Sequence, residues 1–241
     1  LSTIAPPAND GTSNAVATGG TGALFDFPFP RAELTGTPSV SATMAGTLVA
    51  GRDVTVVADS TFVATSYADT ASGGLISVGN ATSSLKLTGD GAPTAITLAG
   101  SIAAGGNLTA ATTIDHSITS TARSVGGGLV AVKVAYSNAW LDDDATVTVA
   151  PGATLTAGGA LALSVGTTNT GSSSSNAYSG SAGGAVAADD QNNPDRGLRI
   201  GSAGNNVLRA VEIGAGSSLT GSTVSLVAET TGVYVSTDTQ A

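Results

Sequence analysis

The chain has 241 residues, with 8 Lys and Arg against 17 Asp and Glu, so its formal net charge is −9. This charge argues against a nucleic-acid partner, which requires a basic surface, and against anchoring on anionic lipid. The lack of cysteine excludes a disulfide framework, and no apolar run approaches the roughly 20 residues of a membrane span.

The segment 1–14 reads as an extended lead-in or cap, because Pro6-Pro7 and Asn9-Asp10-Gly11 favour turns and extended backbone. Residues 15–44 then form a partial repeat unit, in which Phe25, Phe27 and Phe29 alternate with Asp26 and Pro28. Alternation places the three rings on one face of a strand. They are interpreted as a hydrophobic plug at one end of a stack or, alternatively, as a contact surface for a neighbouring subunit or domain.

The remainder of the chain is organised as repeats. Units cover residues 45–98, 99–150 and 151–213, and a partial unit covers residues 214–241. Equivalent glycines recur at Gly51, Gly105, Gly158 and Gly221, with two nearly equal intervals followed by a longer one. A fixed internal period indicates a repeat architecture. Since a partial unit leads and another trails, we expect the chain to be part of a longer protein.

Each full unit has the same internal order. An apolar turn ending in Ala-Gly precedes the first strand, such as 54–57, which is followed by a stretch rich in Ser, Thr and Ala. A Gly pair then opens a second strand, such as 75–78, and a third strand, such as 95–98, closes the unit. Apolar residues alternate with Thr or Ser, which predicts strands with Thr and Ser facing outward and no helix.

The predicted fold is therefore all-β, a parallel β-helix or β-solenoid built from repeats of about 53 residues, in a single domain over residues 15–241. Strands of about five residues and coils of about 20–27 residues would give each unit two or more coils.

The units AGRDVTVVADSTFVATSYADTASGGLISVGNA and AGGNLTAATTIDHSITSTARSVGGGLVAVKVA resemble the repeats of large bacterial filamentous-adhesin and hemagglutinin-like surface proteins, related in style to autotransporter passengers. The resemblance covers about residues 15–241. It implies an exported, right-handed β-helical stalk with adhesion or interaction surfaces.

The third unit is longer than its neighbours, with the excess near residues 188–197. Carboxylates and arginines gather there, and paired carboxylates serve acid–base cleavage in β-helical polysaccharide-degrading enzymes. The alternatives are a Ca²⁺ site built on oxygen ligands, or a solvated loop of turn-forming residues. The residues concerned are Asp189, Asp190, Asn193, Asp195, Arg196 and Arg199.

A second cluster joins Tyr136, Trp140 and the carboxylates 142–144. It suits either sugar binding on an aromatic platform or an amphipathic ring covering a coil corner beside an acidic turn.

His116, the only histidine, is expected to be exposed on a strand or turn, because Asp115 beside it does not make a triad. Lys86 and Lys133 are expected to point outward, where charge discourages edge aggregation.

No catalytic, cofactor or metal site is assigned. The expected function is a structural or adhesive segment of an extracellular or cell-surface fibre, joined end to end to copies of itself or to flanking repeats, with carbohydrate or a host surface as possible ligands. The alternatives are a β-helical lyase or glycosidase and an ice- or surface-binding protein, although the Thr positions vary between units.

Overall fold

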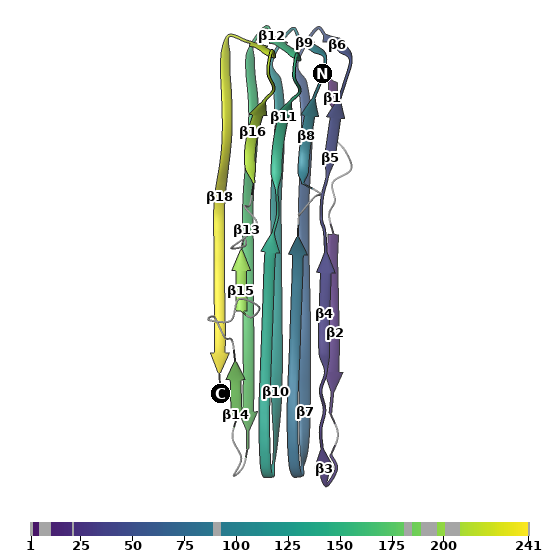
Figure 1. Ribbon diagram of the computed structural model, residues 1–241, viewed down its shortest axis with the longest axis vertical. Coiled ribbons are helices and arrows are strands. Elements are labelled where there is room, and N and C mark those ends of the chain that lie inside the picture. The colour runs from purple at the N-terminus through teal and green to yellow at the C-terminus, as the bar shows by residue number, and fades with distance from the viewer. Residues whose placement is uncertain are drawn as a thin grey trace.

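The computed structural model describes residues 2–4, 11–20, 22–88, 93–180, 185–188, 197–200 and 208–240. All regular elements in these ranges are β-strands, all paired in parallel, so the prediction of an all-β parallel architecture is confirmed (Figure 1). No helix long and apolar enough to cross a bilayer occurs in these ranges.

The main sheet runs in the order β1-β7-β10-β13-β18. Its members are β1 (Ser2–Ile4), β7 (Val54–Thr88), β10 (Leu108–Asp142), β13 (Ala160–Ser179) and β18 (Thr223–Gln240). The shorter strands β2 (Gly11–Gly19), β3 (Phe25–Asp26) and β4 (Arg31–Gly36) pair with β7, and β14 (Ala185–Ala188) and β15 (Gly197–Ile200) pair with β10.

Two four-stranded sheets complete the fold. One has the order β16-β11-β8-β5, with β16 (Arg209–Ile213), β11 (Ala145–Val149), β8 (Thr94–Leu98) and β5 (Ser41–Met44). The other has the order β17-β12-β9-β6, with β17 (Ser218–Thr220), β12 (Thr154–Ala157), β9 (Ser101–Ala104) and β6 (Thr47–Ala50). Every sheet therefore takes a strand from each successive repeat unit.

The length of a coil differs from the prediction. Leu108 pairs with Val54 and Asp142 pairs with Thr88, so the whole of β10 stacks on β7 with one constant offset. A unit thus stacks on the preceding unit as a single layer, and the expectation of two or more short coils in each unit is wrong. The strands are also much longer than expected, because the Ser/Thr/Ala stretch continues the extended backbone.

Each long strand folds back on itself. β7 and β10 run along the molecule, turn at the end that carries β3 and return (Figure 1). The two legs of β7 face each other, since Ser83 donates a hydrogen bond to Ser66 Oγ at 2.8 Å. The turn requires glycine for close approach: a Cβ on Gly128 would lie 2.2 Å from the carbonyl oxygen of Gly74.

The interior between the legs changes along its length. Near the short sheets it holds a large cluster of Val, Leu and Ile, which includes the buried Leu108, Leu161 and Ile96. Further along, it narrows to alanines such as Ala68, Ala122 and Ala177. Small side chains let the two layers approach closely, which explains a chain rich in Ala and Ser and poor in aromatic rings.

Serines contribute to the interior as well as to the surface. Ser66, Ser83, Ser120, Ser137 and Ser173 are all buried. The expectation that Ser and Thr face outward is confirmed near the strand starts, where Thr55 is partly exposed between the buried Val54 and Val56, but it is wrong for this serine layer. The serines avoid the cost of burial because they bond one another and the backbone.

Candidate functional site: a buried polar network

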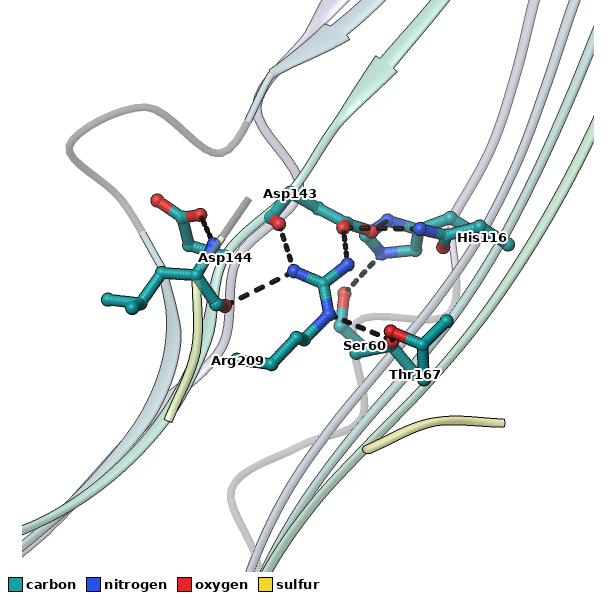
Figure 2. A network of polar contacts seen from close by, with 9 residues as sticks. Ser60, His116, Asp143, Asp144, Thr167 and Arg209 are labelled. Carbon is teal, nitrogen blue, oxygen red and sulfur yellow. Dashed lines mark hydrogen bonds and ion pairs between the residues drawn. The ribbon is translucent and has the colours of Figure 1, made fainter. Parts of the chain in front are cut away.

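A network of polar side chains joins three repeat units where the long strands approach the short sheets (Figure 2). Ser60 lies on β7, His116 lies on β10, and Asp143 follows the last residue of β10. All three side chains point into the core, where Ser60 is 1% exposed, His116 0% and Asp143 3%.

The three side chains lie in the order Ser–His–Asp. Ser60 Oγ is 2.9 Å from His116 Nε2, and His116 Nδ1 is 3.0 Å from Asp143 Oδ2. The tautomer with its hydrogen on Nδ1 places the ring N–H beside the carboxylate and lets Nε2 accept the hydroxyl proton of Ser60. The contact between Nδ1 and Oδ2 is close, but neither atom has a well-aligned hydrogen bond.

Arg209, the first residue of β16, binds Asp143 from the other side. Its guanidinium donates to Asp143 Oδ1 and to the Asp143 carbonyl oxygen, both at 2.5 Å, and to Thr167 Oγ1 at 2.8 Å. Asn169 also donates to Asp143 Oδ1, at 3.3 Å. The carboxylate therefore joins the second unit to two strands that follow it, β13 and β16.

The ionisation of Asp143 reflects this environment. Burial alone would raise the pKa of the carboxyl, but contact with His116, the positive charge of Arg209 and the Asn169 amide together lower the pKa below its usual range. Asp143 is thus a carboxylate at neutral pH and stays paired with Arg209, whose side chain is 10% exposed.

The order Ser60–His116–Asp143 is that of a hydrolase triad, in which the serine attacks a carbonyl carbon. A substrate would have to reach Ser60 Oγ, which is enclosed in the core. The Asp143 carboxylate also forms an ion pair with Arg209, and an aspartate that only orients a catalytic histidine does not need such a pair. The contacts of Ser60, His116, Asp143 and Arg209 thus link residues of three repeat units inside the core.

The expectation that His116 is exposed is wrong. Ile114, His116 and Ile118 have the same parity along β10, and all three are buried. That parity was available in the sequence and would have placed His116 inward. Asp115 has the opposite parity and is exposed, so it takes no part in the network.

The predicted outward position of Lys133 is also wrong, because its side chain is fully buried. The ammonium donates to Ser72, and to Ser77 Oγ at 2.5 Å, near the fold-back turn of β7. Burial lowers the pKa of Lys133, and the negative charge of Asp26 partly opposes that shift. Lys86 is exposed as expected, and its Nζ lies 4.4 Å from the centroid of the Trp140 ring.

The sequence left two interpretations of the aromatic and acidic cluster open, and the structure does not favour the sugar-binding platform, because these side chains do not share an exposed surface. Asp142 and Asp143 are buried, and Asp144 Oδ1 accepts a hydrogen bond from the Leu208 backbone at 2.7 Å. Tyr136 and Trp140 are only partly exposed, and Lys86 covers the Trp140 ring. The acidic residues therefore serve the core and the start of β16.

The insertion of the third unit lies mostly outside the described residues, as do Asp189, Asp190, Asn193, Asp195 and Arg196, and the side chain of Arg199. Its position follows from the register, because Tyr136 pairs with Ala188 and Asn138 pairs with Gly197. The segment 189–196 thus occurs in the third unit where the second has only Ser137. Within the described ranges, no group of three His, Asp or Glu side chains is placed to hold a metal ion.

No family model, curated protein or solved structure matches this chain.

Proposed function

We propose that the chain is a segment of a right-handed β-solenoid that serves as a structural or adhesive stalk in an exported bacterial surface or extracellular fibre. The in-register stacking of whole units supports this proposal, since nearest-neighbour stacking of this kind can be extended indefinitely. Right-handed crossovers between parallel strands are the rule, which supports the handedness. The bacterial source, export and adhesion rest on the resemblance of the repeats.

The single observation that carries the proposal is the outer face of the stack at β18. Leu226 pairs with Leu163, and Val224 pairs with Leu161. The two leucines of β13 are fully buried, whereas Val224 and Leu226 are 47% and 48% exposed. Among the described strands, β18 pairs only with β13, so its other edge offers unsatisfied backbone groups. A further coil of the same kind would cover both the apolar residues and this edge.

The experiment is electron microscopy and light scattering on the isolated chain at increasing concentration. We expect linear, end-to-end assemblies, because a head-to-tail contact does not close on itself. Leu226→Asp should abolish them by placing a charge on the open face. Val63→Asp is the matched control, since Val63 is 43% exposed on β7, which pairs with β2 on one edge and with β10 on the other and so lies at neither end of the stack. Particles that stay single at every concentration, or assemblies that survive Leu226→Asp, would contradict the proposed contact.

A further inference from the structure

The long legs of the coils are stacked to different depths. We call the part of each coil before the fold-back turn the outgoing leg and the part after it the return leg. Among the described strands, outgoing legs form five layers, from β1 and β2 through β7, β10 and β13 to β18. Return legs form four layers, from β3 and β4 through β7 and β10 to β14 and β15, and each short sheet also has four strands. Within these strands, the β18 layer is therefore an outgoing leg only.

This difference decides how a second copy of the chain fits on the β18 end. If β1 and β2 of the second copy lay on β18, the outgoing legs would be continuous, but the return legs and the short sheets would be one layer short. The strands on the two sides of that gap would lie about 9.6 Å apart, twice the spacing of paired strands, which is too far for backbone hydrogen bonds. Simple stacking therefore leaves most of the end of the first copy uncovered.

Replacing one leg removes the gap. If β18 takes the place of β1 and β2 on β7 of the second copy, then β18 and the second copy's β3, β4, β5 and β6 together make one coil. In that arrangement β14 and β15 meet β3 and β4, β16 meets β5, and β17 meets β6, each at a single strand spacing. All the stacks then continue from one copy into the next.

An apolar row of the core continues through such a joint. Met44 pairs with Leu98, Leu98 with Val149, and Val149 with Ile213. The first three are at most 7% exposed, whereas Ile213 at the end of the row is 42% exposed. In the joint, Met44 of the second copy comes next to Ile213 and covers it, so the row runs on without a polar break.

The long strands match in the same way. By register through β10 and β13, Val224 of β18 is equivalent to Val54 of β7. In the joint, Val224 lies against Val54 of the second copy, at the position that Ser2 holds in the single chain. β18 is also 18 residues long, whereas β1 and β2 have 3 and 9 residues. The replacement therefore gives β7 a longer backbone ladder and an apolar residue in place of a serine.

We infer that copies of this chain join by strand exchange, in which β18 of one copy displaces β1 and β2 from β7 of the next. The inference rests on the proposed end-to-end assembly and adds which edge of the next copy receives β18. The strands that form the joint on the first copy, β14 to β18, hold more residues than the roughly 20–30 that each side of a standard interface contributes. The contact is thus large enough to be specific and stable.

The phenylalanines near the start of the chain take no part in this joint. Phe25 and Phe27 are 56% and 52% exposed, while Asp26 between them is buried. The rings therefore point sideways, away from the core, so the interpretation of a plug over the end of the stack is wrong. Phe27→Asp should leave the assemblies intact, and their loss in this variant would contradict the geometry of the joint.

Single cysteines distinguish strand exchange from simple stacking, because the chain has no cysteine of its own. Ser236 of β18 is equivalent by register to Thr65 of β7, and Thr65 pairs with Asn14 of β2. After exchange, Ser236 of one copy lies beside Thr65 of the next, whereas in a simple stack it lies beside Asn14. Residues in register on adjacent strands are close enough for a disulfide, and residues two layers apart are not.

The experiment mixes Ser236→Cys with Thr65→Cys in one sample and with Asn14→Cys in another, under assembling conditions, and oxidises both. We expect about tenfold more mixed disulfide in the sample with Thr65→Cys, measured by intact mass. Hydrogen exchange on the unmodified chain gives a second readout. The amides of residues 11–19 should exchange faster in assemblies than in single particles, because β2 is released, whereas simple stacking would slow them.

Two results would overturn strand exchange and differ in what they say about assembly. Assemblies that link Ser236→Cys to Asn14→Cys, with slower exchange at residues 11–19, would leave the end-to-end proposal standing and refute the exchange. Particles that stay single at every concentration would refute both.

Discussion

Replacing Asp143 by alanine removes the one anion that two buried groups share. Arg209 then keeps its positive charge in a site that is 10% exposed, and His116 loses the oxygen 3.0 Å from Nδ1. Breaking a buried ion pair by removing one partner costs about 3–5 kcal/mol. For a chain of this length each kcal/mol lowers the melting temperature by about 2–4 °C, so Asp143→Ala should lower it by about 6–20 °C.

The assay is thermal unfolding at pH 7, followed by far-UV circular dichroism. Asp69→Ala is the control, because Asp69 pairs with Arg123 at 3.5 Å on the surface, where the two side chains are 23% and 48% exposed. Such a pair contributes about 0–1 kcal/mol. Equal shifts for Asp143→Ala and Asp69→Ala would refute the reasoning, because the buried network would then add nothing beyond a surface contact.

Three further predictions concern backbone strain and pH. Gly46 and Gly100 both have positive φ, at 93° and 85°. A Cβ added at Gly46 would meet nothing, whereas a Cβ added at Gly100 would lie 2.1 Å from the carbonyl oxygen of Gly46. Gly46→Ala should therefore lower the free energy of unfolding, measured in urea, by about 1–2 kcal/mol, and Gly100→Ala should lower it clearly more. Folding lowers the pKa of Asp143, so the stability that this carboxylate contributes is fully present above its unfolded pKa of about 3.9 and is lost as the pH falls through the folded pKa. Asp143→Asn should therefore make the free energy of unfolding depend less on pH in the acid range. Folding lowers the pKa of Lys133 from 10.5, so between the folded pKa and the unfolded pKa the unfolded state binds more protons than the folded state. The free energy of unfolding should therefore rise with pH up to about 10.5, and this rise should be absent in Lys133→Met.

The repeat pattern of the sequence was sufficient to predict the strand class and the pairing partners. The spacing between Gly51 and Gly105 is also the offset between β7 and β10, in which Val54 pairs with Leu108. This agreement has a physical cause: parallel strands stack equivalent positions, so a repeat in sequence becomes a register in space. The starts of the long strands at Val54 and Leu108 follow for the same reason.

The coil length could not be read from hydrophobicity alone. Between residues 60 and 72 the inward side chains are mostly Ser, Thr and Ala, which produce almost no apolar alternation. Their burial is possible because hydroxyls find partners on the facing leg, as Ser83 does with Ser66. Such contacts depend on residues brought together by the fold-back, and so does the contact between His116 and Asp143.

The buried polar layers provide what the apolar layers lack, namely a single register. A slip of two residues would preserve the backbone ladder and the inward–outward alternation, and where both inward positions are apolar, as at Leu108 and Ala110, it would exchange one apolar side chain for another. It would not preserve the serine layer, since Ser120 would leave its bond to Ser83 and face an alanine layer instead. Each buried hydroxyl left without a partner costs about 1–3 kcal/mol. With five serines in that layer and the His116–Asp143–Arg209 contacts in another, a slipped coil would lose more than the few kcal/mol that separate a marginally stable fold from its unfolded chain. A chain made of repeats with a shared pattern is thus held in one alignment by its least hydrophobic core positions.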